Sequence, residues 1–129
     1  MKHLEKLEIL RLSAQKALGT LEDILKKPFD LVVRDATIQR FEYCFEITWK
    51  LLKEYLKSKE GIVCTSPKSC FREAFSIKIL SKEETELSLQ MTDDRNLTSH
   101  TYHEGVAEAL YQKMQIYYDL MDKIVCGIE

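Results

Sequence analysis

The chain has 129 residues, enough to bury a core, and we expect residues 1–129 to form one domain. Hydrophobic residues make up 45% and charged residues 31%, as in ordinary globular proteins, and no apolar run approaches the roughly 20 residues that span a bilayer. The first residues, Met-Lys-His-Leu-Glu, mix charged and apolar side chains, unlike a signal peptide. We therefore expect a cytoplasmic protein without membrane contact.

The formal net charge of −2 is unevenly distributed. Residues 1–60 contain 12 lysines and arginines against 10 acidic residues, whereas residues 61–129 contain 7 against 11. This pattern lacks the basic stripe typical of proteins that bind nucleic acid along their length. Any contact with RNA would have to be local or assembled by oligomerisation.

The cysteines favour neither a metal site nor a redox motif. They show no Cys-x-x-Cys pair and no regular spacing, which argues against zinc. We expect reduced and mostly buried thiols at Cys44, Cys64, Cys70 and Cys126.

Two long amphipathic helices are predicted first. The first helix should end before Pro28, and Asp30 is a suitable N-cap for the second, which Gly61 should terminate. Apolar positions recur every three or four residues in both. The stripe of the first helix is Leu4, Leu7, Leu10, Ala14, Leu18, Leu21 and Leu25, and that of the second is Val33, Thr37, Phe41, Phe45, Thr48, Leu52 and Leu56.

Three further helices are predicted after an extended connector at residues 62–65. Ser66-Pro67 should begin a short third helix, because serine caps and proline suits the first helical position. Capping boxes at 81–84 and 101–104 should begin the fourth and the last helix. The predicted fold is all-α, an antiparallel up-and-down bundle of about four main helices plus a short extra helix.

The segment between the fourth and last helices carries the most chemistry. Arg95 is followed by His100 five residues later and by Tyr102 two residues beyond that. Arginine binds phosphate or carboxylate, histidine transfers protons near neutral pH, and tyrosine can hydrogen-bond or act as a nucleophile. We expect Arg95 to end the fourth helix, Asn96 to satisfy backbone groups at the turn and Tyr102 to begin the last helix, whose N-terminus attracts anions.

Other interpretations of these residues stay open. Arg95 could be a surface residue paired with Asp93 or Asp94. A metal site could combine His100 and His103 with Asp93 or Glu104, although one histidine then lies outside the helix.

One face of the second helix is a further candidate surface. Its spacing of three or four residues aligns Gln39, Glu42, Glu46, Trp49 and Lys53. One interpretation is a solvated face with pairs such as Glu46–Lys50. The other is a face that supports Arg95 and His100, either within the chain or as a dimer contact.

Three segments together resemble a known family, the nucleotidyltransferase substrate-binding-like proteins of the HEPN superfamily of helical bundles. The resemblance spans nearly the whole chain. The segments are Ile38-Gln39-Arg40-Phe41-Glu42 with Glu46 and Trp49-Lys50, then Ser66-Pro67 with Arg72-Glu73-Ala74-Phe75, and Asp94-Arg95-Asn96-Leu97-Thr98-Ser99-His100-Thr101-Tyr102.

The resemblance implies a helical homodimer that works with a minimal nucleotidyltransferase. In relatives with the full Arg-x4-His-x-Tyr pattern, the arginine and histidine are associated with metal-independent RNA cleavage, and the transferase silences toxins of this kind by transferring AMP to the tyrosine. Carried over, Arg95 and His100 would be catalytic and Tyr102 the acceptor. Other relatives are regarded as non-catalytic subunits that present a substrate.

We therefore expect a dimeric substrate-binding partner of a minimal nucleotidyltransferase, without metal or cofactor, with Tyr102 available for AMP transfer. The alternative is an endoribonuclease toxin in which His100 moves protons and Arg95 stabilises the phosphorane. A purely structural subunit is a third interpretation. RNA or a nucleotide is a further candidate partner. The acidic run from Glu83 to Asp94 should weaken RNA association unless basic residues line a dimer cleft; the candidates are Arg40, Lys50, Lys53 and Arg72, beside Asn96, Glu42, Glu46 and Trp49 as supporting residues.

Overall fold

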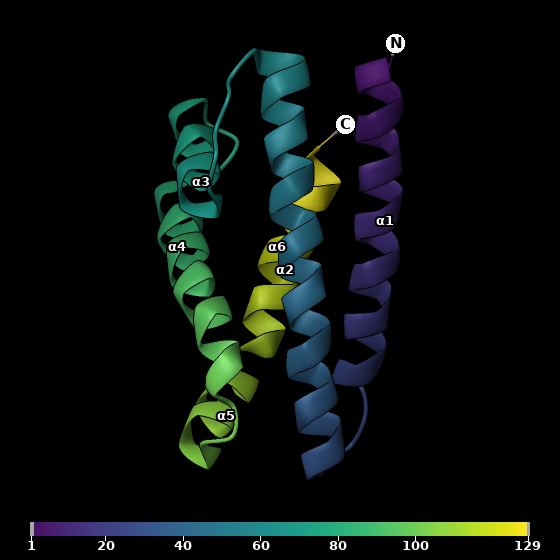
Figure 1. The fold of residues 1–129 in the computed structure, drawn as a ribbon, viewed down its shortest axis with the longest axis vertical. Coiled ribbons are helices and arrows are strands. Elements are labelled where there is room, and N and C mark those ends of the chain that lie inside the picture. The colour runs from purple at the N-terminus through teal and green to yellow at the C-terminus, as the bar shows by residue number, and fades with distance from the viewer. Residues whose placement is uncertain (1, 129) are drawn as a thin grey trace.

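The computed structural model describes the backbone of residues 2–128 and the side chains of residues 5–128. Within this part the chain is all-α, with six helices, one short 3-10 turn and no strand, so the all-α part of the fold prediction is confirmed (Figure 1). The elements are α1 (Lys2–Leu25), α2 (Leu31–Glu60), α3 (Pro67–Ser76), α4 (Lys82–Leu97), η1 (Thr98–His100), α5 (Glu104–Tyr111) and α6 (Met114–Gly127).

Helix α1 runs beside α2 in the opposite direction (Figure 1). It ends at Leu25, three residues before Pro28, as its sequence predicted. The apolar stripe faces inward, since Leu7, Ala14, Leu18 and Leu21 are buried. The predicted stripe member Leu4 lies outside the described side chains.

Helix α2 is the central element and packs against α1, α3, α5 and α6. Asp30 accepts a hydrogen bond from the Val33 amide at 2.7 Å, and Gly61 ends the helix in the left-handed conformation at φ 67°, so both predicted caps are confirmed. Phe41 stacks on Tyr117 of α6 with 5.5 Å between ring centroids. These contacts make the face of α2 toward α6 part of the core.

Helices α3 and α4 begin where their capping residues predicted. Ser66 accepts a hydrogen bond from the Ser69 amide, with Pro67 in the first turn. Ser81 and Glu84 form the predicted capping box, because each side chain binds the other's backbone amide. Residues 62–65 form an irregular connector, as expected.

The prediction of one long last helix is wrong, because the structure has two. Helix α5 ends at Tyr111 and α6 begins at Met114. The Lys113 amide bonds to the Leu110 carbonyl, which tightens the turn, and the Lys113 ammonium reaches Asp94 of α4 at 3.0 Å. A tertiary ion pair therefore accompanies a break that no glycine or proline marks.

The predicted capping box at residues 101–104 is also wrong. The N-cap of α5 is His103, without a side-chain cap bond, and Tyr102 lies in the turn before the helix. The carboxylate of Glu104 binds Arg34 instead, and that longer-range pair replaces the local bond.

The expectation of reduced thiols is corrected at two positions. Cys64 and Cys70 form a disulfide, because the connector folds back along the first turns of α3 and brings their Cα atoms within 5.3 Å. Cys44 is a free buried thiol whose pKa burial raises to about 12, and it donates to the Ala17 carbonyl at 3.2 Å. Cys126 is free but exposed.

Candidate functional site

Arg95 lies in the last turn of α4 and reaches across to α2. Its guanidinium lies 3.3 Å from the carboxylate of Glu46. The same carboxylate accepts from the indole N–H of Trp49 at 3.3 Å and lies 3.8 Å from the Lys50 ammonium. The face of α2 that carries Glu46 thus supports Arg95, and it also contains the predicted Glu46–Lys50 pair. No hydrogen bond, ion pair or ring contact joins His100 to this face among the described residues.

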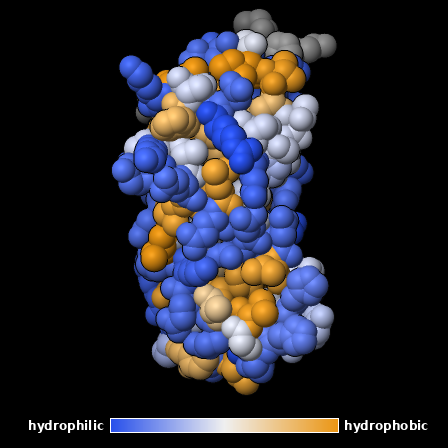
Figure 2. Space-filling view, turned by 90° about the vertical axis from the view of Figure 1, so that its left-hand side faces the viewer, coloured by the Kyte–Doolittle hydropathy of each residue, from blue (hydrophilic) through white to orange (hydrophobic). Residues whose placement is uncertain are grey.

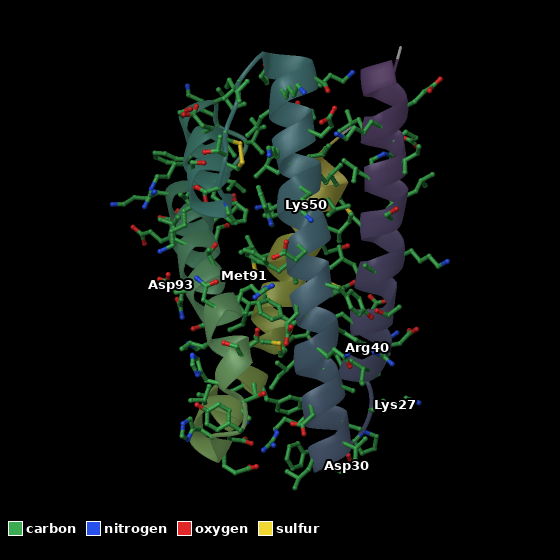
Figure 3. The ribbon with its side chains drawn as sticks, viewed as in Figure 1. Lys27, Asp30, Arg40, Lys50, Met91 and Asp93 are labelled. Carbon is green, nitrogen blue, oxygen red and sulfur yellow. A yellow bond between two sulfur atoms is a disulfide. The ribbon has the colours of Figure 1, made fainter. Side chains whose placement is uncertain are left out.

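The two aspartates before Arg95 do not pair with it, so that interpretation is wrong. Asp93 points to the outside of α4 and pairs with Lys68 of α3 at 2.6 Å (Figure 3). The Arg95 side chain is 31% exposed, and its Nε is buried with no hydrogen-bond partner in the described part of the chain. Arg95 therefore keeps donor capacity beyond its pair with Glu46.

Asp94 fixes the end of α4 against α6. Its carboxylate is almost buried, lies 3.0 Å from Lys113 and accepts a hydrogen bond from the Tyr117 hydroxyl. Burial first, and then this neighbouring carboxylate, raises the pKa of the Tyr117 phenol well above its usual range, so it stays a protonated donor. Because Asp94 precedes Arg95 directly, these bonds hold the backbone that carries the arginine.

The turn after Arg95 is closed by Thr98. Its hydroxyl donates to the Arg95 carbonyl at 2.7 Å, and its side chain is buried. Asn96 was expected to satisfy this turn, but its side chain is exposed and only its backbone carbonyl accepts a bond, from Ser99 at 3.3 Å. Thr98 is thus a structural residue of the motif that the sequence interpretation missed.

His100 and Tyr102 are presented on the surface between α4 and α5. Tyr102 is 74% exposed, and its ring centroid lies 6.1 Å from that of His100 and 4.3 Å from that of His103. The three rings form a small aromatic cluster in which the Tyr102 hydroxyl has no hydrogen-bond partner among the described residues. The phenol is therefore accessible to a second protein.

An ion pair between a buried arginine and an exposed glutamate anchors this turn at its other end. Arg34, one turn into α2, donates to the two Glu104 oxygens at 2.6 and 3.2 Å and to Asp35 at 3.0 Å. The side-chain hydrogen bond to Arg34 lowers the pKa of Glu104. Sequence interpretation missed this pair, although Arg34 lies on α2 eight residues before Glu42 and twelve before Glu46.

The remaining predicted supporting residues are not all near the motif. Glu42 is half-buried on the same face of α2 as Glu46, and Trp49 is half-buried beside Glu46. Arg40 instead lies on the α1 side of α2, where it donates to the Thr20 carbonyl at 2.7 Å (Figure 3). Arg72 of α3 is exposed.

The geometry gives no support to a metal site. Among the described side chains, no three histidines, cysteines, aspartates or glutamates are grouped as metal ligands, so the combination of His100 and His103 with Asp93 or Glu104 is not assembled.

The face over α3 and α4 is largely hydrophilic, with an apolar area toward the end that carries α5 (Figure 2). None of the described helices is long and apolar enough to cross a membrane.

Comparison with known families identifies the chain. Residues 10–128 match the family described as nucleotidyltransferase substrate binding protein like. The chain belongs to this family. The match includes every motif residue from Arg95 to Tyr102, together with the supporting face of α2. It confirms the resemblance inferred from the sequence.

Two solved structures are similar to this member of the family. The crystal structure of a protein from Thermus thermophilus shares 44% identity and a TM-score of 0.87, covering 90% of this chain and 98% of that one. HI0074 from Haemophilus influenzae, described as having the fold of a substrate binding domain of a nucleotidyltransferase, shares 19% identity and a TM-score of 0.67, covering 97% and 98%. The second likeness concerns the fold alone. Comparison with curated proteins gave no match.

Proposed function

We propose that this chain is the substrate-binding partner of a minimal nucleotidyltransferase and that Tyr102 accepts AMP from it. Family membership over residues 10–128 supports the partnership. The observation that carries the acceptor role is the 74% exposure of Tyr102, whose hydroxyl lies on a turn held at both ends by ion pairs. A transferase active site can therefore enclose the phenol without unfolding the chain.

The proposed transfer uses ATP as the AMP donor. The Tyr102 oxygen attacks the α-phosphorus, the bond from that phosphorus to the bridging oxygen breaks, and pyrophosphate leaves. The phenolic proton passes to a base of the transferase or to water. The product carries a new negative phosphodiester beside His100, which would repel RNA phosphate.

The test is intact-mass analysis after incubation with the transferase, ATP and magnesium. We expect a gain of one AMP per chain, lost in Tyr102→Phe and kept in Tyr43→Phe, which changes a 42% exposed tyrosine on another surface. Modification of Tyr102→Phe at the wild-type rate would contradict the acceptor assignment.

A second candidate, metal-independent RNA cleavage, is favoured by one observation. The Arg95 Nε is buried without a partner beside the exposed end of α4, so the guanidinium has a donor to offer a phosphate oxygen once a ligand displaces it from Glu46. In this candidate His100 transfers the proton and Arg95 stabilises the charged phosphorane.

RNA cleavage by the purified chain in EDTA tests this candidate, with intact mass confirming that Tyr102 is unmodified. Cleavage that is lost in His100→Ala and kept in His103→Ala would support it. Equal cleavage by wild type and His100→Ala would identify a contaminating nuclease.

The proposal also takes the working form to be a homodimer of antiparallel up-and-down bundles. The opposite directions of α1 and α2 support the bundle topology (Figure 1). A dimer would bring two copies of His100 and Tyr102 to one assembly, and light scattering of the purified chain tests it: a monomeric mass at micromolar concentration would contradict this part.

A further inference from the structure

A hollow lies where the turn between α3 and α4 meets the C-terminal part of α6, at the end of the bundle away from α5 (Figure 1). It encloses about 630 Å³, within the range of about 300–1,000 Å³ that is usual for small-ligand sites. Phe75 belongs to one of the three family segments, whereas the other lining residues lie outside them. The lining residues are Phe75, Ser76, Lys78, Ile79, Leu80, Ser81, Glu84 and Lys123.

The walls of this hollow are apolar and its single carboxylate is already satisfied. The Phe75 ring is 46% exposed, and Ile79 is half-buried beside it. Glu84 pairs with the Lys123 ammonium and accepts a hydrogen bond from the Ser81 amide at 2.8 Å. The hollow therefore offers apolar surface to a ligand, but no free negative charge.

Lys78 occupies a backbone position that suits glycine better than lysine. Its φ of 67° is the only positive value at a non-glycine residue in the described part of the chain. The Ile79 amide bonds to the Ala74 carbonyl at 2.9 Å and the Lys78 amide to the Phe75 carbonyl at 3.0 Å, which is the Schellman arrangement at a helix end. A side chain is strained at this left-handed position. Strain that glycine would relieve indicates a use for the lysine side chain.

The charge at the rim of the hollow selects the kind of ligand. Lys78 is exposed and has no acidic partner among the described residues. An anion beside the apolar wall would pair with this ammonium, whereas an uncharged ligand would cover it without giving it a partner. A cation would be repelled.

We propose that this hollow binds a small hydrophobic carboxylate, with the carboxylate on Lys78 and the apolar body against Phe75 and Ile79. The inference goes beyond the proposed function, because it requires neither a transferase nor Tyr102. The hollow also lies at the opposite end of the bundle from the turn that carries this tyrosine (Figure 1).

Amide chemical shifts of the isotope-labelled chain test the proposal, with decanoate as the probe below the concentration at which it forms micelles. We expect saturable shifts confined to the hollow, including Lys78 and Ile79. Acetate lacks the apolar body and decyltrimethylammonium has the opposite charge, so each should bind at least about tenfold more weakly. Equal binding of decanoate and decyltrimethylammonium would overturn the proposal, as would decanoate shifts centred on the exposed apolar residues Phe29, Leu31 and Val32 at the other end.

Variants separate the role of the ammonium from that of the fold. Lys78→Gly removes the ammonium and relaxes the backbone, so it should raise the Kd for decanoate at least about tenfold without lowering Tm. Lys78→Gln should weaken binding equally. The matched control Lys16→Gln removes an exposed lysine of α1 outside the hollow and should leave the Kd unchanged. An unchanged Kd in Lys78→Gly would overturn the proposal, and a lower Tm would overturn the strain argument on which it rests. Neither outcome affects the test of AMP transfer to Tyr102.

Discussion

The hydrogen bond from Tyr117 to Asp94 should be a main support of the end of α4. The variant Tyr117→Phe keeps the buried ring and its stacking on Phe41 but removes the hydroxyl that donates to the carboxylate. Hydrogen bonds to charged groups contribute about 1.5–3 kcal/mol, and Lys113 remains to neutralise part of the charge, so we expect a loss of about 2 kcal/mol. For a chain of 129 residues this lowers Tm by about 8 °C.

Urea unfolding at neutral pH, followed by circular dichroism, measures this loss. The matched control is Tyr111→Phe, since the Tyr111 ring packs against Phe29 and its hydroxyl has no hydrogen-bond partner among the described residues. The control should lose less than about 0.5 kcal/mol, as is usual for a change that breaks no specific contact. Equal losses in the two variants, with unchanged m values, would refute the role given to the Tyr117–Asp94 bond.

Two further predictions concern helix ends. Lys123 holds the pKa of Glu84 below its ordinary value of 4.5. The carboxylate therefore contributes fully to the free energy of unfolding above that pH, and this contribution is lost as the pH falls through the lower pKa of the folded state. Glu84→Gln should therefore be less stable than wild type at neutral pH, with the gap closing under acid unfolding conditions well below pH 4.5; a gap independent of pH would contradict this. Gly61→Ala should cost about 1 kcal/mol, because alanine is strained at φ 67°, whereas Gly19→Ala inside α1 should stabilise by about 0.5–1 kcal/mol. Urea unfolding measures the effect of each glycine variant. If Gly61→Ala and Gly19→Ala changed the free energy of unfolding in the same direction, the helix-cap argument would be contradicted.

The sequence predicted those features that depend on neighbouring residues. Asp30, Ser66 and Ser81 each bind an amide three residues later, and Gly61 provides the left-handed end of α2. Such caps act within one turn, so a short stretch of sequence contains all their partners. Their prediction therefore needs no knowledge of the rest of the fold.

The failed predictions involve distant partners. Glu104 looked like a capping residue, but Arg34, 70 residues earlier, takes its carboxylate. The break before α6 accompanies the pair between Lys113 and Asp94, 19 residues apart, and the local sequence there is compatible with a continuous helix. Tertiary ion pairs override local propensity in both cases, and periodicity does not encode them.

The candidate site shows the same division. Spacing alone directed attention to Arg95, His100 and Tyr102, and the structure places Arg95 against Glu46 of the predicted α2 face. The spacing did not reveal that Asp94 binds Tyr117, because that contact depends on how α6 packs. Lys50, Lys53 and Lys57 recur at helical spacing, but the spacing does not show that they line one groove together with Lys6 of α1.

The measurement that tests the central claim most directly is association with a nucleotidyltransferase. The chain would be co-expressed untagged with a tagged minimal nucleotidyltransferase and analysed by affinity purification, size-exclusion chromatography and light scattering. The account predicts one complex of defined stoichiometry that persists through both columns and is retained by Tyr102→Phe, since the acceptor is one exposed side chain. Complete separation of the two folded proteins at micromolar concentration would contradict it.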